Sequence, residues 1–411
     1  AEAFAAKLWG ADYARFSTGG STHANQAIIF ALGQPGDRVA VSRTAHRSVL
    51  SALVLAGLEP IWMSPEIDSA TGVPLGIAVA ELEKALAEKP IAILLTEPGY
   101  LGTISDLPAL IKVAHQQKVP VILDAAWGGH FGFHPQLPQH AFQMGADALI
   151  TSTHKALPGY SASALLLART ELLSAERLEQ SFETTHTTSP AGAPLASIDG
   201  VRALLQTRGE ELLGQLLENI HRFKETVQAE FALPIFLYPS DFPAGRFDPS
   251  KLVLRVQQLG ASGVDIEEDL QQQGIRVEMA DRDTIVFLAT IADTAADFER
   301  LADVLIPILK KRQEQRRESA TALSWSVIPQ KATSMRDAYF AKTEMVAAKS
   351  AVGRISADLI APYPPGVAVV APGEVLTEQI VSGLQASRAA GVRIAYATDS
   401  TLAGFRVVTR S

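Results

Sequence analysis

The sequence predicts an α/β protein whose central sheet is mostly parallel. Over residues 1–170, short β-rich runs alternate with helical patterns. This alternation is typical of βαβ units with helices on both faces of one sheet. A similar but smaller alternation follows residue 250, and 411 residues are enough for two or three domains.

The first part of the chain supplies most of the predicted sheet. Apolar, β-rich runs predict strands at 38–42, 60–63, 91–96, 119–124, 146–151 and 163–168. Helical spacing predicts helices at 1–9, 21–32, 77–88 and 107–117. Ligands of such sheets bind at the carboxyl ends of the strands. Asp124 and the segment 152–155 are expected at that edge.

The second part predicts a long helix, a smaller α/β unit and a tail. Apolar residues keep helical spacing from Leu212 to Phe231. Strands are then predicted at 251–256, 275–279 and 284–288, with helices at 264–273 and 295–311. The charged run 310–318 predicts a solvated helix end or linker. In the tail, 335–360 has a helical pattern, 362–366 breaks the chain, and 367–370 predicts a strand.

These patterns predict three domains. The large domain covers 1–210, the small α/β domain covers 211–325, and a truncated C-terminal module covers 326–411. The boundaries follow the changes of pattern along the chain. No internal repeat is visible.

Composition excludes several classes of function. The chain has no cysteine, which excludes disulfides, thiolate metal sites and a cysteine nucleophile. The net charge of −8 and the lack of a basic patch disfavour nucleic acid and membrane surfaces as partners. No apolar run approaches the roughly 20 residues of a membrane span. The chain does not begin with Met, so residues can be missing upstream, and we predict a soluble cytoplasmic protein.

The segment Ser152-Thr153-His154-Lys155-Ala156 carries the first candidate for chemistry. It directly follows a predicted buried strand. A lysine at such a place can be partly desolvated, which lowers its pKa and makes the amine a nucleophile. Considered alone, the segment favours an ordinary solvated lysine.

A second candidate is the segment Thr18-Gly19-Gly20-Ser21-Thr22, which directly precedes a predicted helix. Its glycines let a ligand approach the backbone, and its hydroxyls and the free N–H groups of the helix start suit a phosphate. The alternative is a helix N-cap after a flexible turn.

Asp124 ends a predicted buried strand, where a carboxylate needs a partner. It could hold a protonated ring nitrogen, cap a turn or bind a metal. Metal binding would recruit His130 and His134, but the aromatic residues around them favour a packed loop over a ligand set. We therefore predict no metal site.

Two histidines and a serine complete the set of candidates. His46 follows the strand at 38–42, as a helix cap or as a ring stacked on a flat ligand. Ser152 and His154 could clamp a phosphate and leave Lys155 free for chemistry. A Ser–His–Asp hydrolase is the rival interpretation, and it fails because Ser152 is not in a Gly-x-Ser-x-Gly elbow.

These parts together match the needs of pyridoxal 5′-phosphate (PLP). Its phosphate needs an anchor, its ring nitrogen an acidic partner and its aldehyde a lysine amine. The early phosphate loop, Asp124, and Lys155 31 residues later supply all three. The joint pattern is more specific than any one part.

With these residues the sequence resembles the fold-type-I Orn/Lys/Arg decarboxylases, PLP-dependent enzymes of bacteria. The strongest segments are 124–135, with its run Asp-Ala-Ala-Trp-Gly-Gly-His-Phe-Gly-Phe-His-Pro, then 145–147 and 152–155. Supporting segments are 16–26, 43–49, 184–199, 363–366 and 372–374. Residues 205–320 match only in pattern.

The resemblance implies a fold and a role for each candidate. The fold would be aspartate aminotransferase-like, with a C-terminal decarboxylase module. The implied roles are Lys155 on the aldehyde, Asp124 on the ring nitrogen, His46 on the ring face, Trp127 near the phenolic oxygen, and Gly20, Ser21, Thr22, Ser152 and His154 on the phosphate. Thr187 or Thr188 would reach the phosphate of a neighbouring subunit, which implies a homodimer or larger homo-oligomer. Lys155 or His46 would return a proton to the substrate.

The implied activity is decarboxylation of arginine, lysine or ornithine to the amine and CO2, a step in polyamine biosynthesis. An aminotransferase or other lyase of this fold is an alternative, with Arg255 or Arg276 as a clamp for the substrate carboxylate. A non-catalytic paralogue with a regulatory role is another, and retention of Lys155 and Asp124 argues against it.

The sequence departs from the family pattern at two positions of the site. Ala125 stands where the family usually has an acidic residue, and Gly19 where it often has Asn. These departures put efficiency and substrate choice in question. For the distal cation of the substrate, the tail offers the carboxylates of Glu374 and Asp358, outside the predicted site residues.

Overall fold

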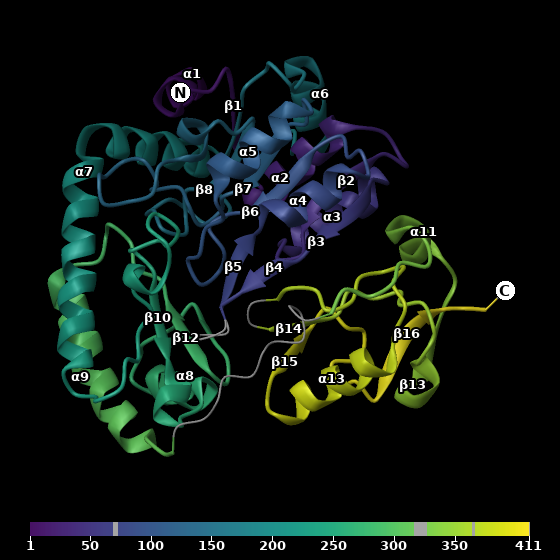
Figure 1. The fold of residues 1–411 in the computed structure, drawn as a ribbon. Coiled ribbons are helices and arrows are strands. Elements are labelled where there is room, and N and C mark those ends of the chain that lie inside the picture. The colour runs from purple at the N-terminus through teal and green to yellow at the C-terminus, as the bar shows by residue number, and fades with distance from the viewer. Residues whose placement is uncertain (69–72, 316–326, 364–365, 411) are drawn as a thin grey trace.

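The computed structural model describes residues 1–68, 73–315, 327–363 and 366–410. Its largest feature is a seven-stranded sheet in the order β1-β9-β8-β7-β6-β2-β3 (Figure 1). The five strands from β8 to β3 are parallel, and β9 runs antiparallel to both of its neighbours, β8 and the edge strand β1. The predicted α/β class with a mostly parallel sheet is confirmed.

The strands of this sheet lie close to their predicted positions. They are β1 (Tyr13–Ser17), β2 (Arg38–Ser42), β3 (Glu59–Met63), β6 (Ile93–Thr96), β7 (Val121–Asp124), β8 (Ala148–Ser152) and β9 (Ala164–Ala168). Only β1 was missed. It is an edge strand whose Arg15 pairs with Glu179 and Glu183, so its polar residues hide the β pattern.

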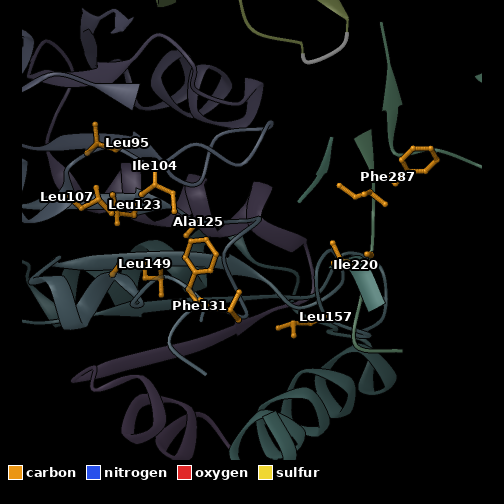
Figure 2. Packing of buried hydrophobic residues seen from close by; sticks show 14 of the residues in the cluster. Leu95, Ile104, Leu107, Leu123, Ala125, Phe131, Leu149, Leu157, Ile220 and Phe287 are labelled. Carbon is orange, nitrogen blue, oxygen red and sulfur yellow. The ribbon is translucent and has the colours of Figure 1, made fainter. Parts of the chain in front are cut away.

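Helices cover both faces of the sheet. They are α1 (Glu2–Trp9), α2 (Gly20–Leu32), α3 (Arg47–Ala56), α4 (Val79–Leu86), α5 (Leu107–Gln116) and α6 (Ala175–Thr185), with a 3-10 turn η1 (Ala141–Met144) and a hairpin of β4 (Pro65–Ile67) and β5 (Pro74–Ile77). Alternate strand residues enter two different hydrophobic clusters. Figure 2 shows Leu95, Leu123 and Leu149 of one cluster, from β6, β7 and β8. Burial on both faces explains why these strands read as continuous apolar runs.

The smaller α/β unit is built around a three-stranded antiparallel sheet in the order β10-β12-β11. Its elements are α7 (Gly192–Gln228), η2 (Pro239–Asp241), β10 (Leu252–Arg255), η3 (Val256–Leu259), α8 (Gly263–Gln272), β11 (Met279–Ala280), β12 (Thr284–Phe287) and α9 (Ala295–Arg312). Figure 1 shows α7 running from the large sheet alongside this unit. The predicted boundary after residue 210 falls inside α7, and the division into domains stays a prediction.

The predicted strand at 275–279 is wrong except at its last residue. The N–H of Ile275 donates to Leu270 O at 3.0 Å, so this residue closes the end of α8. Gly274, in the left-handed region at φ 73°, makes that turn possible. Pairing with β12 begins only at Met279.

The tail folds differently from its prediction. Its elements are α11 (Met335–Phe340), β13 (Thr343–Ala347), α12 (Ala348–Ala351), β14 (Ala361–Tyr363), α13 (Glu378–Ala389), β15 (Arg393–Ala395) and β16 (Gly404–Val408). The continuous helical pattern predicted for 335–360 is wrong, because 343–347 pairs antiparallel with β16. The strand predicted at 367–370 is also wrong, since of these residues only Val370 forms a bridge, with Ile360.

Two other predictions fall partly outside the described residues. Within the charged run 310–318, residues 310–312 end α9, and Lys310 pairs with Glu230. Residues 316–318 lie outside the described residues, and so do 364–365 of the predicted break at 362–366. Among the described residues, no helix combines the length and apolarity needed to cross a membrane.

A buried ion pair ties the tail to the large sheet. Arg43, just after β2, donates to both carboxylate oxygens of Glu374, at 2.7 and 2.9 Å, and to Val369 O at 2.9 Å. Both side chains are at most 3% exposed. Glu374 also accepts from the N–H of Ala371. Its carboxylate therefore holds the tail in place, and its suggested role with the distal cation of the substrate finds no support.

Replacing Arg43 by methionine should lower the free energy of unfolding by about 3–5 kcal/mol, because it leaves the Glu374 carboxylate buried without its cation. The double variant R43M/E374L should recover much of this loss, since no charge then stays buried. Urea unfolding of both proteins measures the difference. Equal destabilisation in the single and double variants would contradict this account.

Candidate active site

A cavity of about 300 Å³ lies at the carboxyl ends of the parallel strands. Its lining includes nine of the ten predicted site residues. The lining residues are Gly19, Gly20, Ser21, Thr22, His46, Thr96, Tyr100, Asp124, Ala126, Trp127, Ser152, His154, Lys155, Ser161 and Ala162. Segments more than 130 residues apart in the sequence therefore meet in one place.

The topology of the sheet explains this position. From β2 the chain continues outward to β3, whereas β6, β7 and β8 extend the sheet the other way. A sheet opens a crevice where its strand order reverses in this manner, outside the carboxyl ends of the strands. His46 follows β2, Thr96 ends β6, and Asp124 ends β7.

Asp124 is held by a buried amide that the sequence analysis did not single out. Its Oδ2 accepts from Asn25 Nδ2 at 2.8 Å, and its Oδ1 accepts from the N–H of Ala126 at 3.3 Å. Asn25 lies on α2 and is 1% exposed. No local signal marked it, because it lies 99 residues before its partner.

The same amide connects Asp124 to His46 through a serine. Asn25 Nδ2 also donates to Ser48 Oγ at 3.0 Å. His46 Nδ1 lies 2.8 Å from Ser48 Oγ and accepts from the Ser48 N–H at 3.2 Å. Because Nδ1 is an acceptor, a neutral His46 carries its proton on Nε2. His46 is also the N-cap of α3, so the cap alternative is confirmed and coexists with a place in the cavity.

Hydroxyls and a helix start gather at another part of the lining. Ser21 Oγ and Ser152 Oγ lie 2.8 Å apart, although 131 residues separate them. Helix α2 begins at Gly20, whose φ of 67° requires a left-handed backbone that glycine adopts without strain. His154 lies beside them and donates Nδ1–H to Ser163 O at 2.8 Å. The arrangement combines hydroxyls, free N–H groups and a positive helix end, which suits an anion.

Lys155 is largely buried beside an aromatic ring. Burial lowers its pKa, while the charges of Asp124 and Glu278 raise it. Its Nζ lies 4.3 Å from the ring centroid of Trp127. Burial also lowers the pKa of His46. The charge of Asp124 raises this pKa, and the charge of Lys155 lowers it further. The cavity therefore favours the neutral forms of an amine and an imidazole.

The two departures from the family pattern have separate structural settings. Ala125 lines a second cavity, of about 390 Å³, together with Leu123 and Glu97, while its neighbours Asp124 and Ala126 line the first. Ala125 therefore does not line the cavity that holds Lys155. Gly19 lines the first cavity, and a Cβ there would lie 2.7 Å from His23 Cβ. A side chain at residue 19 would thus displace His23.

Several earlier candidates lie outside the lining. Thr187 is exposed, and its Oγ1 accepts from the Ser189 N–H. Its role at the phosphate of a second subunit stays a prediction. Arg255 and Arg276 do not line the cavity. Asp358 accepts from the Thr398 N–H and from Arg406 Nε, at 2.7 Å each. Its negative charge is therefore paired with Arg406 inside the tail.

The histidines considered for metal binding have other surroundings. His130 Nε2 lies 3.3 Å from Asp248 and 2.9 Å from Ser250 Oγ. His134 Nδ1 accepts from the Gln136 N–H. Over the described part of the chain, no three His, Asp or Glu side chains converge as metal ligands would.

Aromatic residues near the cavity were also missed. Tyr100 lines the cavity, and burial and the charge of Asp124 raise its pKa. Tyr363 and Tyr396 of the tail raise that pKa further, so they lie close by. Arg47 stacks on Tyr396 at 4.5 Å from its ring centroid. The tail therefore reaches the neighbourhood of the site, which no local pattern indicated.

Replacing Asn25 by alanine should destabilise the protein and lower its activity. The change leaves Asp124 Oδ2 and Ser48 Oγ without their buried donor, which should reduce the free energy of unfolding by about 1–3 kcal/mol. Urea unfolding and CO2 release measure the two effects. Asn219→Ala on α7 is the matched control. An N25A protein with unchanged stability and activity would refute a holding role.

Comparisons with known proteins show the family of this chain. Residues 1–240 match the family "Orn/Lys/Arg decarboxylase, major domain", and residues 313–394 match its C-terminal domain. An arginine decarboxylase of Bacillus subtilis is 34% identical over 417 residues, covering 99% of this chain and 84% of that protein.

Solved structures show the same fold. A lysine decarboxylase of Francisella novicida superposes with a TM-score of 0.82 at 20% identity, over 99% of this chain and 71% of that one. A serine palmitoyltransferase of S. paucimobilis with PLP bound superposes with a TM-score of 0.59 at 16% identity, over 75% of each chain. The match of the major-domain family over more than half of the residues and the near full-length relative establish that this chain belongs to the Orn/Lys/Arg decarboxylase family.

Proposed function

We propose that this protein is a PLP-dependent decarboxylase of a basic amino acid, with arginine as the first candidate substrate. One observation carries the proposal: Lys155, Asp124 and the hydroxyls of Ser21 and Ser152 line a single cavity. Membership of the family supports the reaction, and the arginine decarboxylase of B. subtilis supports the choice of substrate.

The residues of the cavity fit PLP. A phosphate needs donors, and the start of α2 offers N–H groups beside Ser21 and Ser152. A protonated ring nitrogen needs a buried carboxylate, and Asp124 is 4% exposed. The aldehyde needs an amine whose neutral form is accessible, and burial lowers the pKa of Lys155. We therefore assign Gly20, Ser21, Thr22, Ser152 and His154 to the phosphate and Trp127 to the ring.

When bound, PLP would accept the electron pair that the substrate's carboxylate leaves behind as CO2 departs. Asp124 would keep the ring nitrogen protonated, and Asn25 would keep Asp124 oriented. Lys155 Nζ and His46 Nε2 are the two groups able to carry a proton to the substrate carbon. Because Nδ1 of His46 accepts from Ser48, its mobile proton is the one on Nε2.

A decarboxylase is favoured over an aminotransferase by the cavity lining. A transaminase site would hold the substrate carboxylate with a bidentate cation such as arginine. Among the described residues that line the cavity there is no arginine. A carboxylate left without such a clamp is free to depart.

Glu278 is the carboxylate we assign to the distal cation of the substrate. Its charge raises the pKa of Lys155, of His154 and of Lys251, so it acts electrostatically on all three. Its side chain is exposed, as a group at the entrance of a site would be.

Glu278→Gln should raise KM for arginine roughly tenfold with a smaller change in kcat, because a charge-assisted contact is lost. Steady-state CO2 release measures both constants. Glu299→Gln, the same change at an exposed position of α9, should leave them unchanged. An unaltered KM in E278Q would remove Glu278 from substrate recognition.

We also propose a cytoplasmic homodimer or larger homo-oligomer in polyamine biosynthesis, with Thr187 reaching a neighbour's cavity. Exposure of Thr187 is compatible with such a contact. Sedimentation gives the subunit number. Mixing K155A and T187A proteins tests the shared site, because a hybrid dimer would regain activity only if each cavity combines Lys155 of one subunit with Thr187 of the other.

The activity itself is tested by adding PLP to the purified protein. We expect absorbance in the visible range and CO2 release from arginine, with lysine and ornithine as comparisons. A protein that stays colourless would refute PLP binding. A coloured protein that transaminates without releasing CO2 would refute the decarboxylase.

A further inference from the structure

A second buried lysine shares the indole of Trp127 with Lys155. Lys251 Nζ lies 3.7 Å from the Trp127 ring centroid, and Lys155 Nζ lies 4.3 Å from it. The two amines can therefore be no farther apart than the sum of these distances. Lys251 directly precedes β10, 96 residues after Lys155, and it is only 6% exposed. None of the roles assigned above uses it.

The fold holds Lys251 in this place. Asp248 is fully buried, and its carboxylate raises the pKa of Lys251. The backbone N–H of Asp248 donates to Gly102 O at 2.8 Å, and the backbone N–H of Lys251 donates to Asp248 O at 3.1 Å. A Cβ on Gly102 would lie 2.6 Å from Lys251 Cγ. The absence of a side chain at Gly102 thus makes room for the Lys251 stem.

Charged groups on several elements face the two amines. Burial lowers the pKa of Lys251 to about 8, with Asp248 and Glu278 raising it and Lys155 lowering it. Lys155 faces Asp124 and Glu278, and its charge lowers the pKa of His46 and His154. Because repulsion between two cations is mutual, an ammonium on either lysine disfavours the charged form of the other.

We propose that Lys251 is a positioning residue for Lys155: its ammonium, which lies against the indole of Trp127, disfavours a second ammonium there and leaves the Lys155 amine free to bind an aldehyde. A neighbouring cation is one of the few devices that activate a lysine nucleophile. An indole face attracts one cation, but a second cation nearby meets the repulsion of the first. The role of the Lys155 amine toward an aldehyde rests on the proposed PLP function. The repulsion between Lys251 and Lys155 does not depend on that function.

The test compares charge at residue 251 in the cofactor-free protein. Acetic anhydride reacts with the neutral amine, and mass spectrometry of the Lys155 peptide across pH gives the midpoint of its titration. Lys251→Arg keeps a permanent cation, and Lys251→Met removes it. We expect the midpoint to rise in the order K251R, wild type, K251M, with about one pH unit between the extremes. Lys112→Met, an exposed change on α5, should not move it.

The outcomes separate this inference from the proposed function. Equal midpoints in K251R and K251M would overturn the inference, whether or not PLP binds. If K251M does not fold, K251R carries the test alone, because its midpoint must lie below that of the wild type, and an equal midpoint would overturn the inference. The rate at which added PLP forms an imine, with loss of water, should follow the same order. Failure of PLP to bind the wild type would refute the function and leave the labelling result standing.

Discussion

Replacing Lys155 by alanine is expected to lower CO2 release by about 10³-fold or more, the largest effect of any single change in this protein. In the proposed function this amine is the nucleophile and a proton carrier, and no other lysine lines the described cavity. Release of CO2 from arginine at saturating PLP measures the loss. Retention of full activity would show that the site lies elsewhere.

The fold should survive this change. Lys155 carries a largely buried polar amine, and removing a polar group that is costly to bury does not weaken a core. We expect an unfolding midpoint at or above that of the wild type. Lys112→Ala, at an exposed position of α5, is the matched control and should keep both activity and stability.

Asp124→Asn should lower CO2 release by about 10²- to 10³-fold while leaving the shape of the site intact. Asn25 Nδ2 donates to Asp124 Oδ2 at 2.8 Å, so the new amide must turn its oxygen toward Asn25. Its NH2 group then takes the place of Oδ1 beside the Ala126 N–H, and it cannot accept from a protonated ring nitrogen. The prediction is checked by CO2 release together with the absorbance of bound PLP.

The double variant D124N/N25D supplies the control for that result. It restores one carboxylate to the buried pair but places it on α2, away from the cavity. Activity should stay low, although the hydrogen bond between the two residues can form again. Recovery of activity in the double variant would show that buried charge, and not its position at Asp124, is what the reaction needs.

Local pattern was sufficient for the central part of this protein. Strands β2, β7 and β8 are buried on both faces and read as apolar runs, so their ends were predictable to within two residues. The residues at those ends follow from the rule that ligands lie at carboxyl edges of parallel strands. His46, Asp124 and Lys155 were found in this way, and Ser21 by its place before a helix.

Local pattern failed where a partner far away in the chain decides the structure. The tail segment 343–347 has helical spacing, yet it forms a ladder with β16, about 60 residues later. Glu374 looked like a free carboxylate until Arg43, 331 residues before it, was seen to hold it. In each case a long-range contact outweighs a weak local preference.

The sequence by itself determined the α/β class, the family resemblance, and the lysine, carboxylate and phosphate loop of the site, because each has a local signal. Only the tertiary structure decided which groups surround them. Asn25 behind Asp124, Lys251 beside Lys155, Glu278 and the tail tyrosines come from distant segments. Their charge states and hydrogen bonds depend on burial and on distances across the fold, and spacing along the chain carries no record of either.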